Sequence, residues 1–181
     1  LTDTFITVKS GQTLNLKLKI DTDAQTGPSL LHGSSTNPLI VVESGATLNL
    51  LTDSGNKGYA ALSLINEGGP TIGGSGTVNV GGCVLYTRGR GASDIQANLT
   101  LQSKSYVDCT YFSGSALTMN GGALFGKAAE GTTVNGVGSL ELSNKPALKN
   151  GSGTAIYPAE VTVYDTEAQF SKAQLVTNIR T

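Results

Sequence analysis

Two stretches of the chain share one pattern: residues 5–16 read FITVKSGQTLNL, and residues 39–50 read LIVVESGATLNL. Each consists of an apolar run, a Ser-Gly corner and an alternating segment, and the second follows the first after 34 positions. Self-similarity at such an interval is typical of proteins built from stacked structural units. The two stretches therefore predict a repeat protein.

A shorter signature, threonine followed by an apolar residue and asparagine, continues the repeat along the chain. In a β-strand successive side chains point to opposite faces, so Thr and Asn share one face and the apolar residue takes the other. The copies begin at Thr13, Thr47, Thr77, Thr118 and Thr133, and Asn98-Leu99-Thr100 carries the polar pair reversed. The intervals of 34, 30, 21, 20 and 15 residues between copies predict strands in register, joined by loops of variable length.

A second apolar run precedes most copies, and glycine-containing corners separate the two strands of each turn. Because two-residue hairpin signals are few, a parallel coil fits better than a meander or a sandwich. We predict an all-β fold, a right-handed single-stranded parallel β-helix of about six to eight irregular rungs, forming one domain over residues 1–181. Residues 166–179 are expected to cap it as a strand or short helix. The expected interior column contains Leu14, Leu48, Val78, Leu99, Met119 and Val134, with Thr over Thr and Asn over Asn outside.

Composition and charge limit the classes of partner that the chain is expected to bind. The net charge is −1, and basic residues are scattered apart from Arg88 to Gly91, so no nucleic-acid partner is predicted. No apolar stretch approaches the roughly 18 residues of a membrane span, so no membrane insertion is expected. Low charge with abundant Ser, Thr, Asn and Gly favours an extracellular, cell-surface location and a fragment of a larger exported protein.

Three segments carry a family resemblance: ITVKSGQTLNLKLKI (6–20), NPLIVVESGATLNLLTDSGNKGYAALSL (37–64) and IGGSGTVNVGG (72–82). Together they resemble the parallel β-helix surface modules of Gram-positive gut and cellulolytic bacteria, over residues 5 to about 82. The resemblance implies a right-handed β-helix without established catalytic residues. It also implies a polysaccharide-binding role of the kind proposed for some members.

One cluster combines aromatic and charged residues. If Cys83 and Cys109 face inward, the alternation turns outward a strip that we predict to bind a ligand. Tyrosine rings stack on sugars, and Arg and Asp hydrogen-bond to hydroxyl or carboxylate groups. The alternative is an ion pair between Asp108 and one of the two arginines, with tyrosines that only cover the core. The predicted ligand-binding residues are Tyr86, Arg88, Arg90, Tyr106 and Asp108.

The remaining candidate side chains do not indicate a particular catalytic or metal-binding chemistry. His32, the only histidine, is predicted to lie in a solvated loop, and the pair Asp21 and Asp23 is either a solvated turn or a calcium site. Cys83 and Cys109 are expected inside, on neighbouring rungs and reduced. Because the chain has no Asp-Asp pair and no Gly-His-Gly signature, we predict no catalytic residue and no cofactor.

Four functions are therefore compared. A non-catalytic polysaccharide-binding or adhesive module, with a polysaccharide or surface glycan as partner, agrees best with the resemblance and the strip. A purely structural stalk or spacer is the first alternative. A carbohydrate-active lyase or glycosidase would need a cleft with two or three convergent carboxylates. Ice binding would need a regular flat threonine array, and the variable intervals argue against one.

Overall fold

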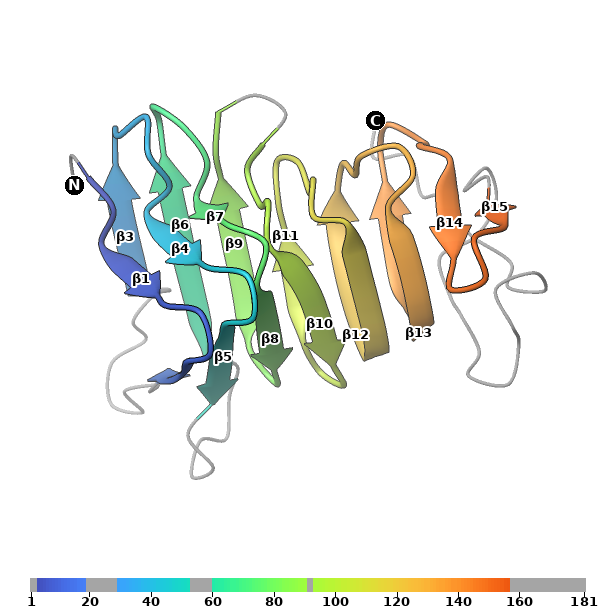
Figure 1. Cartoon of the computed structure of the whole chain (residues 1–181), viewed down its shortest axis with the longest axis horizontal. Helices are drawn as coiled ribbons and strands as arrows, with labels where there is room; N and C mark the ends of the chain where they lie inside the picture. The colour runs from blue at the N-terminus through green and yellow to red at the C-terminus, as the bar shows by residue number, and fades with distance from the viewer. Residues whose placement is uncertain (1–2, 19–28, 53–59, 91–92, 157–181) are drawn as a thin grey trace.

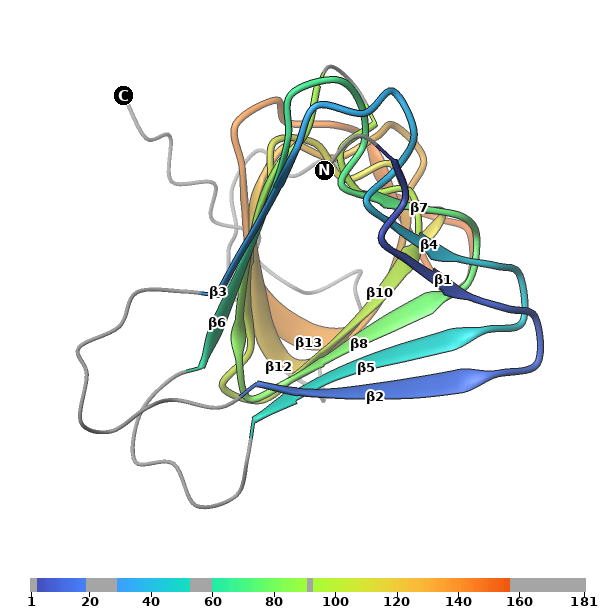
Figure 2. The ribbon, with the colours of Figure 1, turned by 90° about the vertical axis from the view of Figure 1, so that its left-hand side faces the viewer.

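The computed structural model describes residues 3–18, 29–52, 60–90 and 93–156, and every element in this part of the chain is a strand or an isolated bridge. The strands are stacked in parallel around a common interior (Figure 1, Figure 2). The fold is therefore all-β, as predicted, and its curled parallel sheet is compatible with a β-helix.

The chain returns to the same wall in every turn, after a number of residues that decreases along the chain. β1, β4 and β7 form a small parallel sheet, and their bounds are Ile6–Val8, Ile40–Val42 and Ile72–Gly73. Isolated parallel bridges extend this wall through Ile95, Phe112 and Ala128. We call one turn of the stack, from one passage through this wall to the next, a unit, so that β1 to β3 form the first unit and β4 to β6 the second.

The second wall, here named the Thr/Asn face, carries the repeated signature. Its strands β2, β5, β8 and β10 span Thr13–Leu18, Thr47–Thr52, Thr77–Gly81 and Asn98–Gln102. The third wall is named the tyrosine face. Its strands β3, β6, β9 and β11 span Ser29–Gly33, Ala61–Asn66, Val84–Arg88 and Tyr106–Asp108.

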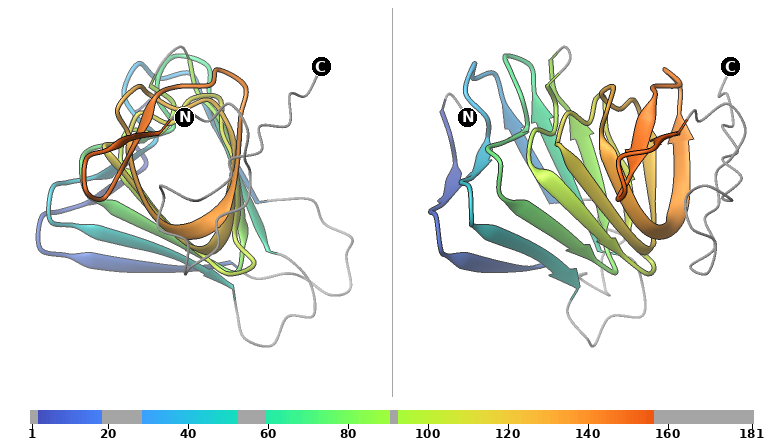
Figure 3. Two further views of the ribbon diagram at one scale, coloured as in Figure 1. Left: turned by 90° about the vertical axis from the view of Figure 1, so that its right-hand side faces the viewer. Right: turned by 45° about the vertical axis from the view of Figure 1, so that its right-hand side comes forward.

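Two longer strands join these walls. β12, Ala116–Gly126, pairs with β10 on the Thr/Asn face and with β11 on the tyrosine face, and β13, Thr133–Leu142, follows β12 around the same corner. The bend passes through Gly121 and Gly136, whose φ angles of 89° and 78° are strained for residues with a Cβ. Further on, β14, Leu148–Asn150, pairs in parallel with β13, and β15, Ala155–Ile156, pairs antiparallel with β14 (Figure 3).

The interior is apolar, because alternate residues of the walls point inward and most of them are Leu, Val or Ile. Leu14, Leu48, Val78 and Leu99 stand in one register across β2, β5, β8 and β10, as predicted. Leu48, Val78 and Leu99 are buried, whereas Leu14 is only partly buried because β2 is the last strand of its wall. The expected capping segment 166–179 lies outside the described residues.

The place predicted for Met119 is wrong. Leu117 pairs with Leu99 and with Val134, and Met119 instead pairs with Leu101 in the neighbouring column. The reversed order of Asn98-Leu99-Thr100 is the reason, because Thr100 takes the asparagine register and aligns with Thr118. The fourth copy of the signature is thus shifted by two residues.

The outer asparagine ladder is confirmed in the first three units. Asn49 donates its side-chain N–H to Oδ1 of Asn15 over 2.7 Å, and Asn79 donates in the same way to Asn49 over 2.7 Å. Beyond them Thr100 is level with Asn79, so the ladder of identical residues ends there.

Candidate functional site

The outward side chains of the tyrosine face are larger and more apolar than the threonines and asparagines of the Thr/Asn face. β9 and β11 alternate between buried and accessible positions, which buries Leu85 and Val107 and turns Tyr86 and Tyr106 outward. Tyr86 is 36% exposed, and Tyr106 is half-buried. Their rings meet edge to face, with centroids 6.1 Å apart and planes at 60°.

A third ring, which sequence reasoning missed, extends this pair. Phe125 on β12 pairs with Asp108 in the backbone register, and its ring centroid lies 4.4 Å from that of Tyr106. Tyr86, Tyr106 and Phe125 therefore form an aromatic strip across β9, β11 and β12. The apolar run GALFG was visible in the sequence, but aligning it with Tyr106 requires the register of β12.

Arg88 and Asp108 form the ion pair expected as the alternative to ligand binding. Nη1 of Arg88 lies 3.1 Å from Oδ1 of Asp108 and also donates to the carbonyl of Thr87 over 2.7 Å. The hydrogen bond to Asp108 raises the pKa of Arg88. Because Arg88 stays about half exposed, the guanidinium is oriented and still accessible.

Arg90 stands apart from this cluster. It follows the end of β9, its side chain is exposed, and its backbone N–H donates to the carbonyl of Gly69 over 3.0 Å. Within the described residues, the ion pair and the side-chain hydrogen bond of Asp108 are made with Arg88 and not with Arg90. The structure therefore brings together four of the five predicted residues.

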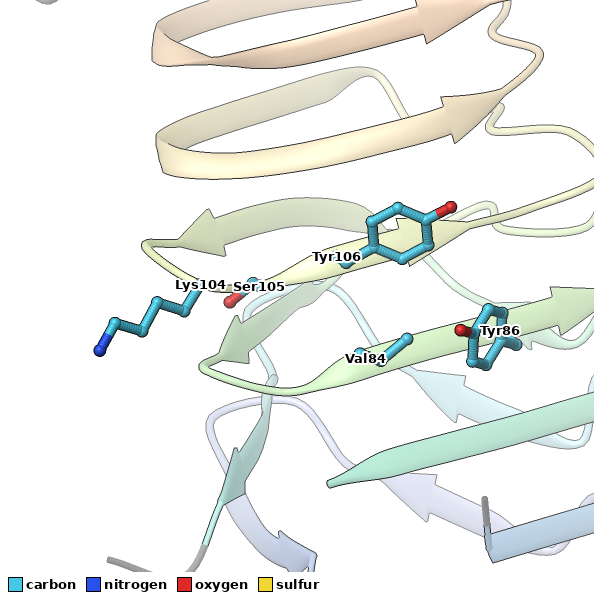
Figure 4. A pocket seen from close by; sticks show the side chains of 5 residues that line it. All are labelled: Val84, Tyr86, Lys104, Ser105 and Tyr106. Carbon is cyan, nitrogen blue, oxygen red and sulfur yellow. The ribbon is translucent and has the colours of Figure 1, made fainter. Parts of the chain in front are cut away.

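A groove of about 370 Å³ opens beside the two tyrosines (Figure 4). It is lined by Val84, Tyr86, Lys104, Ser105 and Tyr106. The tyrosines stand at one end, and the ammonium group of Lys104 extends outward at the other end. Lys104 and Ser105 are further residues that sequence reasoning missed, since they occupy the corner between β10 and β11.

The corner under this groove is held by hydrogen bonds. The buried Ser105 hydroxyl donates to the carbonyl of Val80 and accepts the backbone N–H of Gly82 over 2.9 Å. Lys104 adopts a φ of 62°, a left-handed conformation unusual for a residue with a side chain. The groove floor is therefore tied to the preceding unit.

The buried carboxylate of Asp94 also anchors two of the strands that carry the aromatic strip. Asp94 has no exposed surface, and it accepts hydrogen bonds from the Thr71 hydroxyl at 2.6 Å, the Thr87 hydroxyl at 2.6 Å and the Thr110 backbone N–H at 2.8 Å. Since its oxygens are engaged and shielded, it fixes the ends of β9 and β11 without touching solvent. No motif in the sequence distinguishes Asp94 from an ordinary loop aspartate.

His32 does not lie in a loop, contrary to the prediction. It belongs to β3, level with Ile65 of β6, and its Nε2 lies 3.1 Å from Oε1 of Glu67. Both side chains are more than half exposed. The prediction was wrong because the apolar stretch SLLHG is short and flanked by polar residues, which conceals a strand.

The two cysteines are buried and free, as expected. They belong to neighbouring units but are not stacked, because Cys83 is level with Ser105 while Cys109 follows β11. An offset of four strand residues corresponds to about 13 Å, beyond the reach of a disulfide. Burial raises the pKa of Cys83 to about 11 and raises the pKa of Cys109 still more strongly.

Within the part of the chain described, no group of three or more His, Cys, Asp or Glu side chains could hold a metal ion. Asp21 and Asp23, the calcium candidates, lie outside the described residues. Among the residues described there is also no helix with the length and hydrophobicity needed to cross a bilayer. Comparisons with protein-family models, with curated proteins and with solved structures found no match.

Proposed function

We propose that the protein is a non-catalytic polysaccharide-binding module of an extracellular bacterial cell-surface protein. We further infer that its parallel stack is a right-handed single-stranded β-helix of about six to eight rungs. The observation that carries the binding role is the groove of about 370 Å³ bordered by Tyr86 and Tyr106. The resemblance to β-helix surface modules supports the same role.

The groove suits a sugar better than a flat polar wall does. The faces of pyranose rings are apolar, so aromatic rings such as those of the strip can stack on them while polar groups bind the hydroxyls. Arg88 offers N–H donors beyond those used by Asp108, and the ion pair holds it in place. The ligand therefore meets an aromatic platform with an oriented donor beside it.

Rigidity should contribute to the affinity. β9, β11 and β12 are joined by continuous parallel pairing, and Asp94 fixes the ends of the first two strands. A preformed site loses little conformational entropy when a ligand binds. Even one or two stacked sugar rings should then give a measurable affinity.

The test is a glycan array followed by calorimetry with the best polysaccharide. Tyr86→Ala should weaken binding about threefold to tenfold, the loss expected for one aromatic contact. Phe5→Ala is the matched control, because it removes an exposed ring that precedes β1 on another wall. Unchanged affinity in Tyr86→Ala would contradict the proposed site.

A second measurement separates binding from catalysis. The protein should release no reducing ends and no unsaturated products from the polysaccharide that it binds. Release of either would identify a carbohydrate-active enzyme. Absence of binding to every polysaccharide on the array would favour the stalk or spacer function.

A further inference from the structure

Tyr106 points outward from β11 and has a smaller side chain beside it on each neighbouring strand. Val84 of β9 and Ala123 of β12 stand level with it in the backbone register. Neighbouring strands lie about 4.8 Å apart, so a tyrosine ring that leans towards one strand covers the residue there and leaves the other accessible. The side to which the ring leans therefore decides which of the two small residues stays open.

The ring of Tyr106 leans towards β12. Aromatic residues stand diagonally to it on both sides, because Tyr86 of β9 and Phe125 of β12 are each level with Asp108. Such diagonal neighbours are within reach of an aromatic side chain. The centroid of Tyr106 lies 4.4 Å from that of Phe125 with the planes at 31°, but 6.1 Å from that of Tyr86 with the planes at 60°. The ring thus stacks on Phe125 and only meets Tyr86 edge to face.

The groove of about 370 Å³ lies on the opposite side of the ring, next to β9 (Figure 4). Its lining includes Val84 and Tyr106, whereas Phe125 and Ala123 are not among the residues that line it. Both common χ1 rotamers are accessible to a side chain on a strand. In the rotamer that turns towards β9, the ring of Tyr106 would cover Val84 and fill part of the groove.

We propose that Phe125 is a positioning residue that keeps this groove open by holding the ring of Tyr106 against β12. It acts on the groove through Tyr106 and does not contact what the groove binds. Ala123 contributes through its small size, because a larger side chain at its position would compete with the Tyr106 ring for the space beside Phe125. The importance of the open groove for a polysaccharide rests on the proposed function, whereas the open groove itself does not.

The size of the effect follows from the energy of one aromatic pair. Loss of the stacked partner should shift the equilibrium between the two ring positions about twofold to tenfold towards the closed groove. Anything that requires the open groove is then slowed or weakened in proportion to the fraction of molecules that remain open. Phe125→Leu removes the ring and keeps an apolar side chain, so it isolates the contribution of stacking.

The test measures access to the groove floor without a sugar. Val84→Cys places a thiol in the groove, and its rate of reaction with a fluorescent maleimide reports how often the groove is open. Labelling of the protein without this substitution gives the background from the two buried native cysteines. Adding Phe125→Leu should lower the labelling rate about twofold to tenfold. An equal or higher rate would overturn the proposal.

The direction of the change separates positioning from a merely structural role. If Phe125 only stabilised the strands, its loss would loosen them and raise the labelling rate. Phe125→Tyr keeps an aromatic ring at the same place and should retain the rate measured with phenylalanine. A rate in Phe125→Tyr as low as in Phe125→Leu would overturn the role assigned to the ring.

A measurement on the unsubstituted protein does not depend on the folding of any variant. In nuclear magnetic resonance spectra, the ring protons of Tyr106 should show stronger Overhauser contacts to the Phe125 ring than to the methyl groups of Val84. The reverse order would show that the ring lies over β9 and would overturn the proposal.

The glycan array described above separates this inference from the proposed function. Slower labelling in Phe125→Leu together with no binding on the array would establish the positioning role and refute the polysaccharide-binding function. Binding on the array together with an unchanged labelling rate would refute the positioning role and leave the proposed function standing.

Discussion

The carboxylate of Asp94 accepts a hydrogen bond of 2.6 Å from the Thr87 hydroxyl, and this bond joins the end of β9 to the loop that begins the next unit. Both residues are fully buried, so the bond lies in the interior although one partner is an acid. With Thr71 and Thr110 on the same carboxylate, Asp94 links three segments that carry the tyrosine face.

Replacing Asp94 should therefore destabilise the fold. Asp94→Ala leaves the buried Thr87 hydroxyl and the half-buried Thr110 N–H without their acceptor, whereas the Thr71 hydroxyl keeps the backbone carbonyl of position 94 at 3.0 Å. Each group left unpaired costs about 1–3 kcal/mol. We expect the free energy of unfolding to fall by about 3–5 kcal/mol in urea titrations. Asp108→Ala is the control, because its partly exposed ion pair should contribute about 1 kcal/mol or less. Equal losses in the two variants would contradict the anchoring role.

The two tyrosines should differ in their effect on stability. Tyr106 is half-buried against Phe125, so Tyr106→Ala should reduce the free energy of unfolding by about 1–2 kcal/mol. Tyr86 lies further in solvent, and Tyr86→Ala should change it by about 0.5 kcal/mol or less. Chemical denaturation of both variants checks the order, and the reverse order would contradict the packing described.

Truncating the partly buried Leu14 should reduce the free energy of unfolding less than truncating the fully buried Leu48 of the same column. Leu48 is fully buried beneath the first unit, so Leu48→Ala should cost about 3–5 kcal/mol. Leu14 has the same register but is only partly buried, so Leu14→Ala should cost about half as much. Equal losses in urea titrations would contradict the partial burial of Leu14.

The thiols should be unreactive in the folded protein. Both are buried and have raised pKa values, which lowers the thiolate fraction that reacts with disulfide reagents. A chromogenic disulfide such as DTNB should react slowly with the native protein and count two thiols in denaturant. A count of zero in denaturant without reductant would show a disulfide and contradict this structure.

Stability should fall at alkaline pH. Burial raises the pKa of Cys83 to about 11 in the folded state, above the ordinary value of 9.0 for a free thiol. Between these values the unfolded chain releases the proton and the folded chain keeps it, so the free energy of unfolding decreases as pH rises. In urea titrations from pH 8 to 11, Cys83→Ser should show a shallower decrease than the parent. An identical slope would contradict the shifted pKa.

The sequence alone determined the all-β class and four aligned residues of the core. Alternation of Thr, an apolar residue and Asn has a period of two, which defines the inward and outward faces of a strand without any knowledge of its neighbours. Leu14, Leu48, Val78 and Leu99 could therefore be aligned by their motifs, and the structure aligns them in the same way.

Only the tertiary structure decided which residues meet across neighbouring units, because these contacts depend on the register between the strands. Met119 is shifted into the next column because backbone pairing, rather than the motif, aligns β12 with β10. Phe125 joins Tyr106, Asp94 reaches Thr87, and Cys83 lies far from Cys109 for the same reason. These contacts join residues from strands and loops whose lengths vary, and a local pattern does not encode how much chain each corner uses.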